Sequence, residues 1–164
     1  MADASEFLLA AAAGIQEHLR SYLASDGKEG YLYDMSSSGG SKVSTCLVLK
    51  TTGRKSNRSR FVPLLYAPWA DEFVIVASKG GADEDPAWYL NLTASQEVFF
   101  QVKEKKFRGV WRTPEDEERE RIWNFVTAYF PPYADYQAKT NRRIPVVVLC
   151  PNGRVNETWT SPTS

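Results

Sequence analysis

The residues best suited to bind a ligand lie between positions 50 and 60, where the segment KTTGRKSNRSR holds five basic and no acidic residues. Gly53 and Asn57 tolerate positive φ, which can turn successive backbone N–H groups toward one point and so create a nest for a phosphate or carboxylate. The side chains expected around the anion are Arg54, Lys55, Ser56, Arg58, Ser59 and Arg60. A solvated basic hairpin is the alternative, and the spacing is not that of a P-loop, because no helix follows.

A second candidate is the run ASKGG, residues 77–81, which directly follows a predicted strand. Paired glycines let a ligand approach the backbone closely, and Lys79 adds a positive charge. Trp88 follows a few residues later and could form one wall of a pocket for a flat ligand. On these residues alone, a place for Trp88 in the core fits equally well.

A third candidate is the aromatic pair Tyr133 and Tyr136, which follows Pro131 and Pro132. Residues three apart share one face of a helix, so the two phenols could hold a flat substrate together. Their hydroxyls could also donate hydrogen bonds to a developing negative charge. Aromatic packing around the two prolines is the alternative.

The overall composition excludes several classes of protein. Twenty basic residues balance twenty acidic ones in the 164-residue chain, so no net field attracts nucleic acid or acidic lipid. Acidic residues, Asp3 and Glu6, precede the apolar stretch near the N-terminus, where a signal peptide would carry basic ones. No run reaches the roughly 20 apolar residues that span a bilayer. We therefore expect a cytoplasmic protein, with peripheral contact at a membrane surface left open.

The two cysteines and the single histidine favour neither a disulfide framework nor a metal site. Cys46 and Cys150 lie far apart in apolar runs, no CxxC occurs, and His18 has no second ligand near it in the sequence. We expect two buried free thiols in a reducing compartment and no metal.

The periodicity of apolar residues predicts the elements that position these candidates. Helices are expected at 4–23, 86–92, about 114–130 with Thr113 as its cap, and 133–140; strands are expected at 43–50, 60–67, 72–78, 97–103, 106–112 and 143–150. Five or six strands with helices as insertions and caps indicate an α+β fold centred on a β-barrel. We expect a helix and flexible linker (1–41), a cofactor-binding barrel (42–151) and a polar tail (152–164). The helix is either docked or a mobile arm that closes over a ligand.

Several of these blocks together resemble one known family. TTGRKS (51–56), PLLY (63–66), ASKGG (77–81), PAWY (86–89), YADYQ (133–137) and IPVV (144–147) occur in the order and spacing of the deazaflavin-dependent nitroreductases. The resemblance covers residues 47–151, about two-thirds of the chain. Members of this family reduce their substrates with coenzyme F420, a flat and polyanionic cofactor.

The resemblance implies a split β-barrel of the flavin-binding type and a role for each candidate residue. The cofactor would be bound by Arg54, Lys55, Ser56, Arg58, Arg60, Pro63, Ala77, Ser78, Lys79 and Trp88. Ser78, Tyr133 and Tyr136 would be the catalytic residues, with the two tyrosines facing the substrate. The chain departs from the family pattern at 57–59, at Asp85 in place of a histidine, and at 141–143 in place of acidic residues.

The leading functional hypothesis is an F420-dependent oxidoreductase that transfers hydride to an electron-poor acceptor, such as a quinone, an activated alkene or a nitroaromatic. The alternatives are a reductase that uses FMN on the same barrel and a non-catalytic F420 carrier. Nucleic acid is not expected as a partner, because one basic loop on a neutral protein gives a small footprint. The natural acceptor and the oligomeric state stay open.

Overall fold

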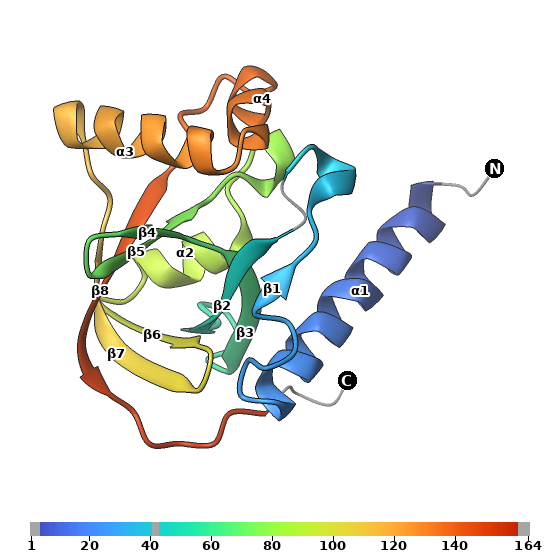
Figure 1. The fold of residues 1–164 in the computed structure, drawn as a ribbon, viewed down its shortest axis with the longest axis vertical. Helices are drawn as coiled ribbons and strands as arrows, with labels where there is room; N and C mark the ends of the chain where they lie inside the picture. The colour runs from blue at the N-terminus through green and yellow to red at the C-terminus, as the bar shows by residue number, and fades with distance from the viewer. Residues whose placement is uncertain (1–3, 41–42, 161–164) are drawn as a thin grey trace.

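The computed structural model describes residues 4–40 and 43–160, and within them eight antiparallel strands form one curled sheet (Figure 1). The strands are β1 (Leu32–Tyr33), β2 (Ser44–Thr52), β3 (Ser59–Leu65), β4 (Ala67–Trp69), β5 (Glu72–Val76), β6 (Glu97–Val102), β7 (Lys105–Arg112) and β8 (Val146–Arg154). The helices are α1 (Ala4–Ala24), α2 (Ala87–Thr93), α3 (Asp116–Tyr129) and α4 (Pro132–Ala138), with short 3₁₀ helices at η1 (Ser36–Ser38) and η2 (Lys79–Gly81).

The strand order explains why the sheet curls into a half-barrel. The path β2-β6-β7-β8-β5-β4 begins at a strand that also pairs with β3. Only Tyr66 separates β3 from β4 in the chain, so the two ends of the sheet are held next to each other. The predicted barrel-centred α+β fold is therefore confirmed.

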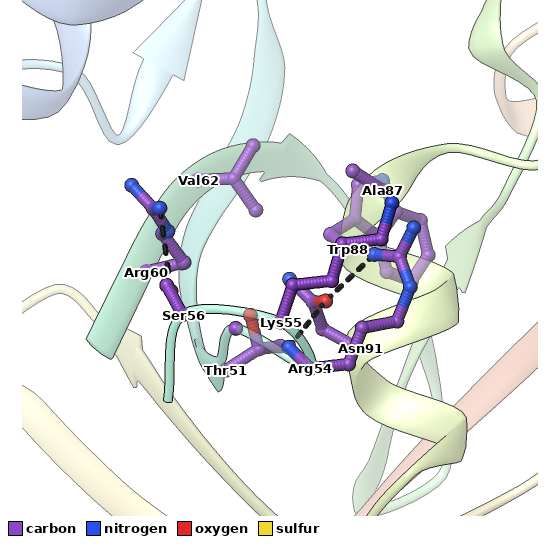
Figure 2. A pocket seen from close by; sticks show the side chains of 10 residues that line it. Thr51, Arg54, Lys55, Ser56, Arg60, Val62, Ala87, Trp88 and Asn91 are labelled. Atoms are coloured by element: carbon purple, nitrogen blue, oxygen red, sulfur yellow. Dashed lines mark hydrogen bonds between the residues drawn. The ribbon is translucent and has the colours of Figure 1, made fainter. Parts of the chain in front are cut away.

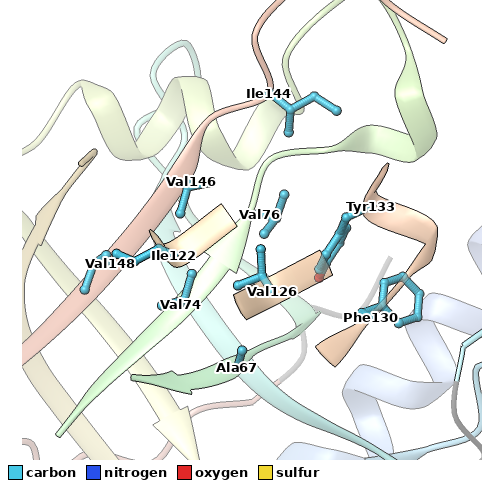
Figure 3. Close-up of a cluster of buried hydrophobic side chains, with 10 residues drawn as sticks. All are labelled: Ala67, Val74, Val76, Ile122, Val126, Phe130, Tyr133, Ile144, Val146 and Val148. Carbon is cyan, nitrogen blue, oxygen red and sulfur yellow. The ribbon is translucent and has the colours of Figure 1, made fainter. Parts of the chain in front are cut away.

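Alternation along the strands divides the apolar side chains between two layers. Ile75, Val147 and Leu149 belong to a cluster inside the curl, together with Leu92 from α2. Their neighbours Val74, Val76, Val146 and Val148 point the other way and pack beneath α3 and α4, as Figure 3 shows. Because side chains alternate across a strand, one short apolar run serves both layers.

The C-terminal half of α1 is docked on the outside of the sheet. Leu19, Tyr22 and Leu23 are buried with Val48 of β2 and with Trp159 near the C-terminus. The Tyr22 hydroxyl donates to the Cys46 carbonyl at 2.9 Å and accepts from the Lys103 N–H at 2.9 Å. The docked interpretation is therefore confirmed for this half of α1.

Most expected elements are present, but five details of the prediction were wrong. The expected strand 60–67 is divided at Tyr66 into two strands, β3 and β4. The region expected to be a flexible linker contains β1 and η1, and Ser41 at its end lies outside the described residues. Thr113 does not cap α3, whose N-cap is Glu115. Strand β8 runs on to Arg154, and the polar tail contains the buried Trp159.

Candidate functional site

The basic segment forms the loop of the β2–β3 hairpin. The Gly53 N–H donates to the Arg58 carbonyl at 2.7 Å, and the Asn57 N–H donates to the Gly53 carbonyl at 2.8 Å. Asn57 has the expected positive φ, 58°, whereas Gly53 does not. A Cβ at Gly53 would lie 2.4 Å from the Ser56 Oγ. A side chain at position 53 would therefore force the Ser56 hydroxyl to move. The prediction of positive φ is confirmed for Asn57 alone, and the anion nest stays a prediction.

This loop and helix α2 enclose a cavity of about 450 Å³. Figure 2 shows Arg60 and Ser56 on one wall, while Arg54 and Lys55 extend toward α2 on the other. The Asn91 Oδ1 of α2 accepts hydrogen bonds from the Arg54 backbone N–H at 3.2 Å and from its guanidinium at 2.9 Å. This pair ties the loop to the helix across the cavity.

The charge of the loop is not neutralised within the described part of the chain. None of its four cations, Arg54, Lys55, Arg58 and Arg60, forms an ion pair there. All four side chains are exposed. A cavity lined by unpaired cations and a hydroxyl suits an anionic group, because charge-assisted hydrogen bonds are stronger than neutral ones.

A larger cavity, of about 890 Å³, adjoins the first. Its lining combines Pro63, Leu64 and Leu65 of β3, Ser78, Lys79 and Gly80 after β5, Tyr133 and Tyr136 of α4, and Ile15, His18, Tyr33 and Met35 from the N-terminal region. Trp88 lines both cavities and also packs against the interior core. The two alternatives for Trp88, ring wall and core, are thus both partly right.

The turn after β5 packs directly against α4. Lys79, Gly80 and Gly81 all have positive φ, 46°, 63° and 88°. A Cβ at Gly81 would lie 2.7 Å from the Tyr136 carbonyl oxygen, whereas one at Gly80 would meet open space. Gly81 therefore allows contact between the turn and the helix, and only Gly80 leaves the backbone open to the larger cavity.

Arg142, which the sequence did not single out as a site residue, holds this turn in place. Its Nε donates to the Ala82 carbonyl at 2.7 Å, and its Nη2 donates to the Ser78 carbonyl at 2.9 Å. Its Nη1 donates to the Ala77 carbonyl at 3.2 Å and pairs with the Asp85 carboxylate at 3.0 Å. Two departures from the family pattern, at 85 and 142, thus contact each other.

The two tyrosines of α4 lie edge to face, with ring centroids 6.4 Å apart. Tyr133 is only 7% exposed and packs on Phe130 beneath α3, whereas Tyr136 is half-buried. Burial raises the pKa of both hydroxyls. Tyr136 adds a smaller increase to the pKa of Tyr133, and Asp135 adds one to the pKa of Tyr136. Neither hydroxyl has a hydrogen-bond partner within the described residues. Both therefore stay protonated at neutral pH and are available as donors.

The remaining candidates lie in different surroundings. Arg58 contributes its carbonyl to the loop but does not line the cavity, and Ala77 is fully buried under the turn. Lys79 pairs with Glu84 at 3.3 Å. A place for the N-terminal helix beside a ligand was one of its two predicted alternatives, but the residues that line the larger cavity there could not be named, because spacing cannot show which strand a helix docks on.

A curled antiparallel half-barrel with a basic loop and two adjoining cavities has the architecture of a split barrel. Residues 15–151 match the family described as F420H(2)-dependent quinone reductase, so the chain belongs to that family. The predicted class, an oxidoreductase that uses coenzyme F420, is confirmed at this level, and the FMN alternative has no such support.

Individual relatives agree with this assignment. An F420H(2)-dependent quinone reductase of Mycobacterium tuberculosis is 43% identical over 107 residues, which cover 63% of this chain and 71% of that protein. The solved structure of an F420-H2-dependent reductase, FDR-A, is 42% identical. The match covers 63% of this chain and 92% of that chain, with a TM-score of 0.57. A structure described as a domain-swapped dimer is 31% identical, and the match covers 90% of this chain and 99% of that chain, with a TM-score of 0.61.

Both cysteines are free, as expected, but only Cys46 is buried; Cys150 is half-buried, which corrects the expectation of two buried thiols. Among the described residues, no helix combines the length and the apolar character that crossing a membrane requires.

Proposed function

We propose that this protein reduces a quinone with F420H2, binding the anionic tail of the cofactor in the smaller cavity and its ring, beside the quinone, in the larger one. The observation that carries the proposal is that the two cavities meet at Trp88. A flat, polyanionic cofactor needs a cationic compartment and a ring-sized compartment side by side. The half-barrel provides both along strand β3.

The lining of the smaller cavity fits the tail. Arg54, Lys55 and Arg60 form no ion pair with any described residue, and Ser56 adds a hydroxyl. Arg58 lies outside the lining, so we assign it a weaker, long-range attraction. Arg54 is already held by Asn91, which fixes the direction of its guanidinium before any ligand binds.

The lining of the larger cavity fits the ring and the acceptor. Trp88 and Pro63 form apolar walls, and the turn at Ser78 brings a hydroxyl to the cavity. Because Arg142 anchors the Ser78 carbonyl, the backbone of this wall is fixed in advance. Preorganised walls hold the reacting partners in a productive orientation, which lowers the barrier without any chemistry by the protein.

The chemistry of reduction divides between cofactor and protein. In its reduced form the deazaflavin ring supplies a hydride. The acceptor oxygen then carries negative charge and needs a proton to complete the quinol. Tyr136 is the residue we assign to this oxygen, because it lines the cavity and its hydroxyl stays protonated. Tyr133, more deeply buried, orients Tyr136 by edge-to-face packing and adds a second donor.

The test is a fluorescence titration with F420, run beside FMN in identical salt. The variant Lys55→Ala/Arg60→Ala should bind F420 at least about tenfold more weakly, because charge-assisted contacts are lost. The control Lys105→Ala/Arg121→Ala removes the same charge from exposed positions outside both cavities and should bind normally. Equal affinity in both folded variants, or preference for FMN, contradicts the assignment.

We also propose a cytoplasmic location, with any membrane contact peripheral. Two free thiols are typical of a reducing compartment. Cell fractionation tests this: the protein should be in the soluble fraction or leave the membrane in a salt wash. Retention that only detergent reverses would contradict it.

A further inference from the structure

A third cavity, of about 650 Å³, lies between α3, α4 and the segment that precedes β8. It shares no lining residue with the two cavities assigned to cofactor and acceptor. Arg119 and Trp123 of α3, Gln137 of α4 and Arg143 contribute to its lining. The proposed reduction gives none of these residues a role.

Arg119 is an unusual residue for a protein interior. It is only 8% exposed, yet within the described residues its guanidinium makes neither a hydrogen bond nor an ion pair. It lies over the Trp123 ring, 5.3 Å from the centroid. Its guanidinium nitrogens are not among the fully buried polar atoms without a partner, so they keep some contact with solvent. Arg119 lines the cavity, so an anionic ligand there could replace that solvent as its hydrogen-bond partner.

Arg143 adds a second cation to the same cavity. Burial lowers the pKa of Arg119, and the positive charge of Arg143 lowers it further. The two guanidinium groups are therefore near enough to repel each other. The backbone on both sides of Arg143 is fixed: Gln137 Nε2 donates to the Arg142 carbonyl at 2.7 Å, and Gln137 Oε1 accepts from the Ile144 N–H at 3.0 Å. Among the residues that the structure describes, the two cations are therefore held in the same cavity by the fold and not by an ion pair with a carboxylate.

Three carboxylates also line the cavity, from Asp116, Glu117 and Glu120. None of them forms an ion pair with either arginine within the described part of the chain. Their negative charge disfavours a polyanion such as a nucleic acid strand. A ligand here must therefore be a single compact anionic group that contacts the two arginines and not the carboxylates.

We propose that Arg119 and Arg143 form a binding site for a single carboxylate or phosphate group of a small molecule. Guanidinium groups bind both kinds of anion through paired, charge-assisted hydrogen bonds. The Trp123 ring contacts the Arg119 guanidinium through a cation–π interaction and restricts its movement. The site is separate from the basic loop, so both can be occupied at once.

The test uses the full-length protein and follows the Nε–Hε signals of its arginines by NMR. Sodium phosphate, or in a second series sodium acetate, replaces sodium chloride at constant ionic strength. Saturable shifts of the Arg119 and Arg143 signals are expected with at least one of the two anions. Saturation by phosphate alone or by acetate alone identifies the preferred group.

Variants separate this site from general charge effects. Arg143→Gln changes an exposed residue and should weaken anion binding about tenfold or more, as should Arg119→Met if that variant folds. Arg121→Gln removes an exposed charge from the same helix outside the cavity and should bind normally. Linear shifts with both anions, or unchanged affinity in folded Arg143→Gln, overturn the proposal. Because the basic loop is untouched, F420 affinity is measured in parallel and reports separately on the proposed function.

Discussion

Replacing Arg142 by methionine tests whether one side chain organises the wall of the larger cavity. The guanidinium is 15% exposed and donates to the carbonyls of Ala77, Ser78 and Ala82 and to the Asp85 carboxylate, over 2.7 to 3.2 Å. Methionine fills similar space but donates nothing. The substitution therefore leaves a carboxylate and three backbone carbonyls without this donor.

The expected loss follows from these contacts. Breaking a buried ion pair by removing one partner costs about 3–5 kcal/mol, and the ion pair alone contributes less here because the Arg142 and Asp85 side chains are 15% and 32% exposed. Each hydrogen bond to a charged group contributes roughly 1.5–3 kcal/mol, but water can replace part of these at a cavity edge, so the contributions do not sum. We expect Arg142→Met to lower the free energy of unfolding by about 3–5 kcal/mol. In a protein of this size that lowers Tm by roughly 6–20 °C.

Two further variants show which contacts carry the loss. Asp85→Asn keeps an acceptor for Arg142 and all three carbonyl bonds, so it should cost only about 1 kcal/mol. Arg142→Lys keeps the charge but cannot span three carbonyls and should fall between the two. Urea unfolding of each variant gives the free energies, and F420 affinity on the same samples reports on the cavity wall. A loss in Arg142→Met no larger than in Asp85→Asn would refute the reasoning.

Three other substitutions test the rest of the site. Trp88→Ala should weaken F420 binding and lower turnover; a large drop in melting temperature with normal activity per folded molecule would instead assign the ring to the core. Tyr136→Phe should keep F420 affinity while quinone turnover falls of the order of 10²-fold. Because the pKa of Tyr136 is raised, its hydroxyl still donates above the ordinary phenol pKa of about 10, so a pH profile of turnover should show no loss from this residue between about pH 7 and 10. Gly81→Ala should destabilise the fold more than Gly80→Ala in thermal melts, because only the former brings a Cβ against α4.

The sequence predicted what depends on local pattern. The run IPVVVLC predicted a buried strand, and in the structure Val146 and Val148 pack outside the curl while Val147 and Leu149 pack inside it. The hairpin at 97–112 was also correct, because alternating apolar residues surround a charged turn. The unpaired charge of the basic loop followed from composition, since the segment holds five basic and no acidic residues; that the loop binds an anion stays a prediction.

What could not be predicted depends on contacts between distant segments. The partners of Arg142 are three carbonyls and one carboxylate that lie 57 to 65 residues away in the chain. Backbone carbonyls are present at every position and leave no trace in the sequence. Strand β1 has only two residues and owes its pairing to β2, so no periodicity could reveal it.

The glycine pair after β5 shows how one residue type can serve two purposes. Both glycines adopt positive φ, as the sequence allowed. Gly81, however, is required by the carbonyl of Tyr136 on α4, and only Gly80 opens toward the cavity. The same contact places the helix that carries Tyr136 against the turn that carries Ser78, while Arg142 fixes that turn from behind. The position of the proposed proton donor relative to the proposed ring wall is therefore set by a glycine and an arginine that need not touch either ligand.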